Sequence, residues 1–380
     1  MPLYFFKNIT EKLDNSNYQY LTLVIPLAKL TKKKEEKLKF LQKEFTECVK
    51  FFLKETQRIN TTSPYKLHKL YYKAAREKFK LTAMLIQTAR DRAIAIQRIY
   101  WVRLKNGKHA SKPHITSLLP LHFRQDSYAL IRTSRGNWMI RFASGPGRKE
   151  YLSLPIVVRP YILQYLNKTF IPGAMEIYRK YKKWLISLSI KIPYHLKIFE
   201  NIIGVDLGIR HPAVLSNGKF FSGKPFRYIR YKQYRNKFIL KTKKRKRKEH
   251  YQITYLNHLI SKQIIQIALK EKANLSLENL IGIKERLVKR GEISPLLLSN
   301  WPYKQIFDFI RYKANLAGIK VVTVNPSGTS ITCSKCGYSD ENNRINQCIF
   351  KCKNCGFELN ADLNAARNIA KKGAELLRSS

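Results

Sequence analysis

The chain has 380 residues, 44% of them hydrophobic, which excludes wholesale disorder and is enough for about two to four domains with their own cores. Its 73 Lys and Arg residues against 25 Asp and Glu give a formal net charge of +48. A compact protein tolerates such self-repulsion when a polyanion neutralises it, so nucleic acid is the expected partner. The charge would also suit a ribosomal-type protein or a protein that binds a membrane surface, and these are the alternative classes. No apolar run reaches the ~18 residues that a membrane span needs, and no signal-peptide pattern opens the chain. These features predict a cytoplasmic, nucleoid-associated protein with no membrane partner.

The N-terminal part predicts one strand followed by three helices. Residues 18–27 are β-branched and aromatic, and Pro26 near their end indicates an edge strand. Leu38, Leu41, Phe45, Val49 and Phe52 then recur at three- and four-residue steps, as on the buried face of a helix. Further helices are expected from Ser63-Pro64 and over residues 81–101.

Strand patterns return after a loop at 107–120. Apolar and polar residues alternate on both sides of a Gly136-Asn137 turn, and strands are also expected at 151–158 and 183–192. We therefore expect a β-barrel wedge domain made of residues 1–30 and 112–198, with a helical recognition insert at 31–111.

The chain changes character at Asn201. The run NIIGVDLGIRHPAVLSNGKFFSG predicts three strands of a meander, the last two joined by an Asn217-Gly218 turn. A helix at 253–267, a strand at 274–277, a helix at 301–316 and a strand at 319–324 follow, with a loop expected at 282–298. Residues 226–235 are aromatic and basic, and the run KTKKRKRK at 241–248 fits a solvated face or linker as well as a phosphate-binding surface.

Four cysteines near the C-terminus have the spacing of a zinc ribbon. Cys333 and Cys336 form one CxxC pair, Cys352 and Cys355 form the other, and fifteen residues separate the pairs. Two disulfides in a secreted domain are the alternative, which the missing signal peptide disfavours. We predict a structural Zn²⁺ site, with Cys348 and Cys48 outside it.

Three acids occupy comparable places in this half of the chain. Asp206 interrupts an apolar strand, Glu278 ends a later strand, and Asp362 begins the last helix. Each has an ordinary explanation: a turn cap for Asp206, a surface acid for Glu278 and a helix N-cap for Asp362. Together they predict a site for two Mg²⁺ ions that cleaves phosphodiesters, because clustered carboxylates repel one another until divalent cations bind them. The order of strands and helices around them is that of an RNase H-like (RuvC) nuclease domain.

The chain resembles the TnpB family of transposon-encoded RNA-guided nucleases, which are related to type V CRISPR effectors. The likeness is carried by IIGVDLGIR around Asp206, LNHLISKQII at 256–265, LENL around Glu278, the segment from WPYKQIF to TCSKCG at 301–337, and CKNCGFELNADLNAARNIA at 352–370. It implies that Asp206, Glu278 and Asp362 form the RuvC triad and that Cys333, Cys336, Cys352 and Cys355 bind zinc. It also suggests that Arg367 faces the scissile phosphate.

The resemblance implies a multidomain α/β protein that is an RNA-guided, Mg²⁺-dependent DNA endonuclease. Its nuclease domain would comprise residues 199–325 and 358–380, with the zinc ribbon inserted at 326–357. Its partners would be a guide RNA derived from the transposon end and double-stranded target DNA, bound by a monomer of the protein on its RNA. A DNA strand-transfer transposase and a non-cutting RNA-guided regulator are the alternatives, and the intact three acids disfavour the second.

Overall fold

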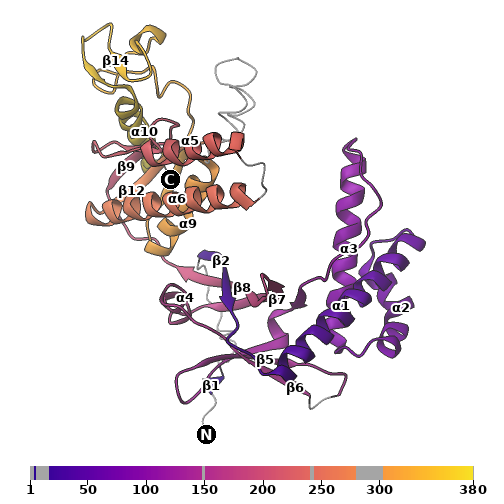
Figure 1. Cartoon of the computed structure of the whole chain (residues 1–380). Helices are drawn as coiled ribbons and strands as arrows, with labels where there is room; N and C mark the ends of the chain where they lie inside the picture. The colour runs from indigo at the N-terminus through magenta and orange to yellow at the C-terminus, as the bar shows by residue number, and fades with distance from the viewer. Residues whose placement is uncertain (1–3, 6–16, 148–149, 240–243, 280–302, 380) are drawn as a thin grey trace. The chain divides into compact units, whose positions relative to one another are not determined.

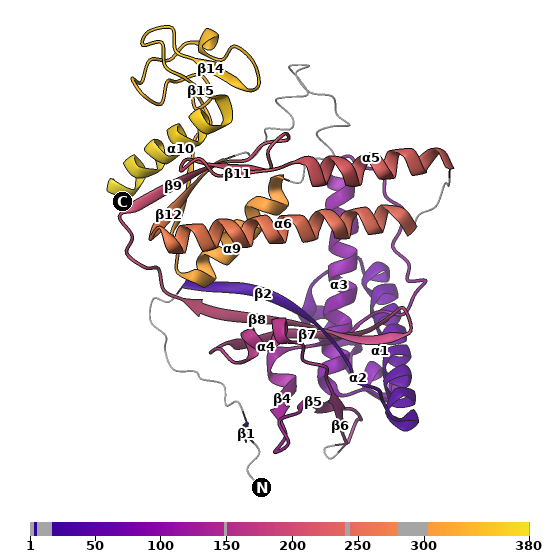
Figure 2. The same cartoon turned by 60° about the vertical axis from the view of Figure 1, so that its left-hand side comes forward.

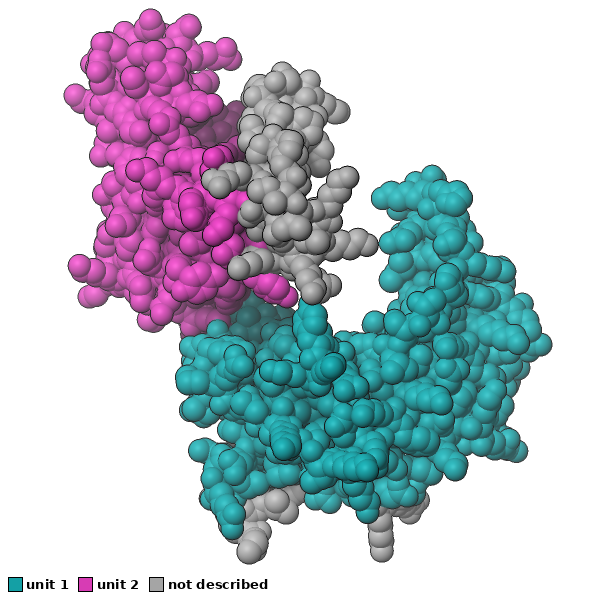
Figure 3. Space-filling view, viewed as in Figure 1, with its two compact units in different colours: residues 1–193 teal, residues 194–380 magenta. Residues whose placement is uncertain are grey.

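The computed structural model describes residues 4–5, 17–147, 150–239, 244–279 and 303–379. The chain divides into two compact units, Met1–Pro193 and Tyr194–Ser380 (Figure 3). The division falls five residues before the predicted start of the nuclease domain at 199, and the finer boundaries within each unit stay predictions. Among the described helices, none combines the length and the apolar composition that crossing a membrane requires.

The three long helices of the first unit form as their sequence patterns predict. They are α1 (Lys32–Arg58), α2 (Pro64–Lys78) and α3 (Ala83–Lys105). The side chains of Thr31, Ser63 and Thr82 accept hydrogen bonds from backbone N–H groups of the first turns, which satisfies donors that the helices cannot pair themselves. The apolar stripe of α1, from Leu38 to Phe52, is fully buried, and α1 packs mainly against α3.

The strands of the first unit form two four-stranded antiparallel sheets, with the orders β1-β4-β5-β6 and β2-β8-β7-β3. An isolated bridge between Leu27 and Ile156 links the two sheets, whereas a closed barrel stays a prediction. The elements are β1 (Tyr4–Phe5), β2 (Asn17–Pro26), β3 (Leu121–Phe123), the 3-10 turn η1 (Gln125–Ser127), β4 (Tyr128–Arg132), β5 (Trp138–Ala143), β6 (Tyr151–Pro155), α4 (Pro160–Leu166), β7 (Ile171–Lys180) and β8 (Lys183–Tyr194).

Strand β7 has no counterpart in the sequence-based prediction. Pro172 and Gly173 lie at its start, where the pairing with β8 is irregular, and they obscure the alternation of apolar and polar residues. The turn from β7 to β8 is made by Tyr181 and Lys182 at positive φ, in place of the Asn or Gly that usually marks such a turn. This hairpin therefore lacks both of its usual sequence signals.

The second unit is built on a five-stranded sheet with the order β11-β10-β9-β12-β13. Strands β9 (Asn201–Asp206), β10 (Ala213–Leu215) and β11 (Phe220–Phe221) form the predicted antiparallel meander, while β12 (Ala273–Glu278) and β13 (Val321–Val324) run parallel to β9. The helices of this unit are α5 (Lys224–Ile239), α6 (Lys244–Lys270), α9 (Tyr303–Ala317) and α10 (Ala361–Arg378).

Helices cover both faces of this sheet. Ile203, Val205, Leu275 and Leu277 pack into the main core with residues of α6 and α9. Residues that alternate with them, such as Gly204, face α10 on the opposite side. Figures 1 and 2 show α10 on one side of β9 and β12, with α6 and α9 on the other. The result confirms the multidomain α/β class.

The basic segments of the second unit lie at least partly in helices. The aromatic and basic stretch at 226–235 lies in helix α5, and residues 244–248 of the basic run begin α6. Residues 240–243, the loop expected at 282–298 and the predicted helix start at Trp301 lie outside the described residues.

The cysteine-rich segment follows β13 and leads into α10. It contains the 3-10 turn η2 (Glu341–Asn343) and a small antiparallel sheet of β14 (Ile349–Lys351) and β15 (Glu358–Asn360). A small core of its own, which includes Cys333, Phe350 and Cys352, holds this segment together.

Candidate nuclease centre and zinc site

Two of the predicted acids end neighbouring parallel strands. Asp206 is the last residue of β9 and Glu278 is the last residue of β12. The register pairs Leu277 with Val205, so the two acids follow at adjacent positions at the carboxyl edge of the sheet. The topology therefore brings together residues that are 72 positions apart in the sequence.

Helix α10 brings the third acid to the same edge. Its residues Ala366 and Ala370 lie against Gly204 of β9, and Gly373 lies against Ser276 and Ile202. Residues later in the helix thus lie over residues earlier in the strand, so α10 runs antiparallel to β9. The first turn of α10, which carries Asp362, therefore reaches the carboxyl end of the strand. The approach is close enough that a Cβ atom on Gly204 would lie 2.0 Å from the carbonyl oxygen of Ala366.

Asp362 lies in the first turn of α10 and is not its N-cap. The cap is Asn360, whose side-chain oxygen accepts from the N–H groups of Asp362 and Leu363. The carboxylate of Asp362 has two basic neighbours: His211 Nδ1 lies 2.9 Å from its Oδ2, and an Arg344 nitrogen lies 3.8 Å from its Oδ1. The N-cap explanation of Asp362 is therefore wrong, and its carboxylate is left to face other side chains.

Asp206 is affected electrostatically by the other two acids. The pKa of Asp206 is raised well above its usual value, first because its carboxyl group is buried and then because the charges of Glu278 and Asp362 oppose its ionisation. Burial also raises the pKa of Glu278, against the lowering effects of a Thr329 hydrogen bond and the charges of Lys372 and Arg344. Without a cation, ionising both groups costs free energy, as in many metal sites built from carboxylates.

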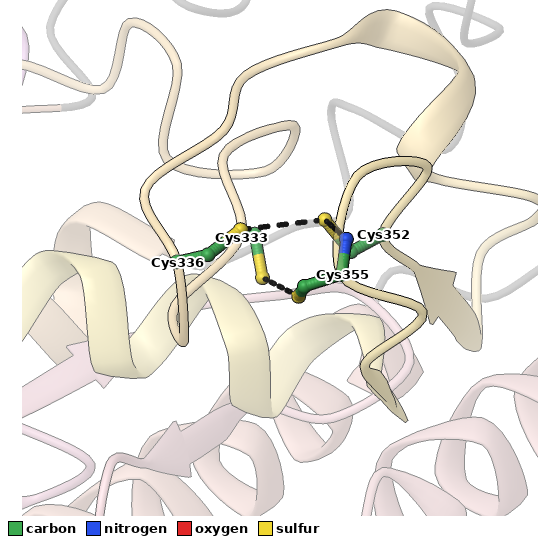
Figure 4. Close-up of side chains that lie close together, drawn as sticks. All are labelled: Cys333, Cys336, Cys352 and Cys355. Atoms are coloured by element: carbon green, nitrogen blue, oxygen red, sulfur yellow. Dashed lines mark hydrogen bonds between the residues drawn. The ribbon is translucent and has the colours of Figure 1, made fainter.

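The four predicted cysteines do converge, as Figure 4 shows. Cys333 Sγ lies 3.7 Å from Cys355 Sγ, and Cys336 Sγ lies 3.6 Å from Cys352 Sγ. Covalent disulfides would need about 2.05 Å, so the disulfide alternative is wrong. Four sulfurs at tetrahedral positions about 2.3 Å from Zn²⁺ would lie about 3.8 Å apart, which is close to the observed spacing.

Each cysteine pair lies in a tight knuckle that ends in glycine. Gly337 and Gly356 adopt φ values of +82° and +68°, and their N–H groups donate to the carbonyls of Cys333 and Cys352. A backbone hydrogen bond at Tyr338 lowers the pKa of Cys336 to about 6, which favours the thiolate that a metal binds. This group of cysteines could hold a metal ion such as zinc.

The two remaining cysteines lie outside the cluster. Cys348 accepts a hydrogen bond from Arg210, and Cys48 is fully buried in the first unit. Neither belongs to the four-sulfur group, as the spacing predicted.

Known proteins resemble this chain in both sequence and fold. The family model described as "Cas12f1-like, TNB domain" matches residues 303–369. The CRISPR-associated endodeoxyribonuclease Cas12f1 of Sulfoacidibacillus thermotolerans is 28% identical over 353 residues, 80% of each chain, and a TnpB-like protein of Methanocaldococcus jannaschii is 26% identical over 60% of this chain and 89% of its own. The chain is therefore similar to Cas12f1 and to TnpB-like proteins.

The fold of the chain also has a solved counterpart. The structure of a Cas12f1 complex with a single guide RNA and target DNA superposes with a TM-score of 0.66 at 21% identity, over 90% of this chain and 83% of the other. The match shows a shared fold across both units.

Sequence reasoning missed three neighbours of the acids. His211 lies in the β9–β10 connection, Arg344 lies between the two cysteine pairs, and Thr329 lies in the segment that follows β13. None carries a periodicity or motif signal, although a histidine five residues after Asp206 was visible in the sequence.

Arg367, which we predicted to face the scissile phosphate, is exposed on α10. Among the described residues it is Arg344 that lies near the acids, with a nitrogen 3.8 Å from Asp362 Oδ1 and a charge that acts on Asp206. Arg367 lies five positions after Asp362, whereas residues on one helix face are three or four positions apart. Its catalytic role stays a prediction.

Proposed function

We propose that this protein is an RNA-guided, Mg²⁺-dependent DNA endonuclease whose active site is formed by Asp206, Glu278 and Asp362. The observation that carries the proposal is that β9, β12 and α10 bring three carboxylates to one edge of the sheet. The charges of Glu278 and Asp362 also raise the pKa of Asp206. The strand order around them supports an RNase H-like (RuvC) domain. The names of the relatives, which include endodeoxyribonucleases and TnpB-like proteins, point to the same activity.

The chemistry of the two donor sets favours different metals. Carboxylate oxygens suit Mg²⁺, and the four thiols suit Zn²⁺. When bound between the acids, a pair of Mg²⁺ ions supplies an activated water and neutralises charge on the leaving oxygen. Zinc in the ribbon is structural, because all four tetrahedral positions are taken by sulfur.

The protein's own side chains then have separable roles. Asp206, Glu278 and Asp362 hold the cations and so place the scissile phosphate. His211 hydrogen-bonds Asp362 and restrains its carboxylate, since the two atoms are 2.9 Å apart. Arg344, whose positive charge acts on both Asp206 and Glu278, offers a guanidinium to a phosphate oxygen as negative charge accumulates there.

Guide RNA and target DNA are the partners that best account for the charge of the chain. The net charge of +48 favours a polyanion in both units, and exposed tyrosines on α5 and α6, among them Tyr228, Tyr231, Tyr251 and Tyr255, offer rings for stacking on unpaired bases. In this scheme base pairing with the guide selects the target, and the protein reads a short flanking DNA motif. The Cas12f1 structure that shares this fold contains both kinds of nucleic acid.

The test is cleavage of a matched plasmid by the purified RNA complex in Mg²⁺. Asp206→Ala should bind the target without cutting it, whereas Asp308→Ala, which removes an exposed acid paired with Lys304 on α9, should cut like the wild type. Full cleavage by Asp206→Ala would overturn the assignment of the site. Joining of transposon ends by the protein without RNA would favour a transposase, and target binding without any cleavage by the wild type would favour a regulator.

A further inference from the structure

The segment that joins β13 to the first cysteine knuckle is bound along one face of α10. Asn364, Asn368 and Lys371 are spaced four and three residues apart, so they share a face of the helix. The side chain of Asn368 donates to the carbonyls of Thr329 and Thr332 at 2.9 and 2.6 Å, and that of Asn364 donates to Thr332 at 2.8 Å. The side-chain amides of Asn364 and Asn368 therefore donate to backbone carbonyls that have no partner from a helix or a sheet in this irregular segment.

The same face also holds the first knuckle. Asn364 Oδ1 accepts from the N–H of Ser334 at 2.9 Å, and Lys371 Nζ donates to the Ser334 carbonyl at 2.6 Å. Ser334 lies between Cys333 and Cys336. One helix face thus carries both the knuckle and the residues just before it.

Thr329 connects this segment to the proposed active site. It is 3% exposed, and its hydroxyl contacts Glu278 Oε1 and, at 2.8 Å, the carbonyl of Pro326. A hydroxyl has a single hydrogen, and an ionised carboxylate is the stronger acceptor, so the hydrogen goes to Glu278. The backbone carbonyl of Thr329 is occupied at the same time by Asn368.

We propose that Thr329 is a positioning residue for Glu278, held in place by Asn368. The hydroxyl donates to one carboxylate oxygen and restrains the group, which would leave the other oxygen to hold a cation. A metal ion bound at the knuckle would support Glu278 through this path. It would also support Asp362, which lies in the first turn of the helix that the knuckle contacts. The inference rests on the proposed function, because it assigns Glu278 a metal to hold.

The structural alternative is that Thr329 only anchors a loop. The two explanations differ in what the hydroxyl does once the loop is in place. An anchoring role predicts lost stability with unchanged metal affinity, whereas a positioning role predicts lost metal affinity with the fold intact. Hydrogen bonds to metal ligands typically contribute 10–100-fold in metal affinity or activity.

The test compares Thr329→Val, which keeps the shape and removes the hydroxyl, with Thr329→Ser, which keeps the hydroxyl. Thr323→Val on β13 is the matched control, because Thr323 is exposed. Binding of Mn²⁺ to the RNA complex is measured by electron paramagnetic resonance without turnover, beside the Mg²⁺ concentration at half-maximal cleavage. We expect Thr329→Val to weaken both by about 10–100-fold, with wild-type values for Thr329→Ser and Thr323→Val.

Wild-type Mn²⁺ affinity in Thr329→Val would overturn the inference, and so would an equal loss in Thr329→Ser. Should Thr329→Val fail to fold, Thr329→Ala against Thr329→Ser decides the matter, because both lose the methyl group and only one keeps the hydroxyl. A wild-type complex that binds Mn²⁺ but never cuts would refute the proposed function alone. The comparison of Mn²⁺ affinities would still test the role of Thr329.

Discussion

Replacing Gly204 with alanine should separate α10 from the sheet. A Cβ atom at this position would lie 2.0 Å from the carbonyl oxygen of Ala366 and 2.5 Å from the backbone nitrogen of Ala370. Ordinary contacts of a Cβ atom lie at 3.4–4 Å, and both obstacles are backbone atoms that cannot rotate away. The helix must therefore move by about 1 Å or more, because the strand is hydrogen-bonded on both sides.

The expected loss in the free energy of unfolding is large for the addition of one methyl group. Overpacking typically costs about 1–3 kcal/mol, and rigid obstacles place this case at the upper end. Alanine recovers about 0.5–1 kcal/mol because it restricts the unfolded chain more than glycine does. We expect a net loss of about 2–2.5 kcal/mol, or about 4–10 °C in the melting temperature of a unit of this size.

The displacement should also reduce cleavage, because Asp362 moves with α10. A shift of 1 Å in a catalytic group can cost about 100-fold in rate. Calorimetry of the full chain measures the stability, hydrogen exchange of β9 and α10 peptides localises the change, and plasmid cleavage measures the activity. The control is Gly147→Ala, since a Cβ atom on Gly147 meets nothing within 4 Å. Unfolding of Gly204→Ala within about 0.5 kcal/mol of wild type would refute the packing argument.

The remaining predictions concern the charges and the metals. The raised pKa values of Asp206 and Glu278 mean that these two groups bind more protons in the folded state. In EDTA their contribution to stability should therefore be greatest in acid and fall as pH rises from the usual carboxyl range to the raised values. Asp206→Asn should lessen that fall in denaturant titrations and abolish the stabilisation by Mg²⁺; an unchanged pH profile would contradict the burial argument. Native mass spectrometry should find one zinc ion per chain, and Cys352→Ser should lose it together with cleavage; full cleavage by the zinc-free variant would exclude the structural role. Arg344→Ala should reduce the cleavage rate by about 100-fold, as loss of a charge-stabilising donor does, and more than Arg367→Ala; the reverse order would restore the sequence-based assignment.

Local patterns were enough for much of the second unit. The spacing of the four cysteines predicted their convergence, because CxxC pairs with glycine after them form knuckles from a few consecutive residues. The meander, the parallel strand before Glu278 and the last helix were predicted from apolar runs and turn residues. Strand β7 was missed because its signals are weak: irregular pairing at Pro172 and a turn without glycine or asparagine.

The neighbours of the acids depended on tertiary structure. His211, Thr329 and Arg344 meet the acids only after the strands pair and α10 packs on them, and their distance from those acids along the chain leaves no periodic trace. The helix cap is Asn360, two residues before Asp362, because the chain enters α10 earlier than the sequence pattern indicated.

The sequence by itself thus determined which side chains could bind metal and on which elements they lie, because ligand chemistry and strand or helix periodicity are properties of short segments. Only the tertiary structure decided how those ligands are supported. The close approach at Gly204, the burial that raises the pKa of Asp206, and the polar face of α10 that connects the zinc knuckle to Glu278 all arise where distant segments pack against one another.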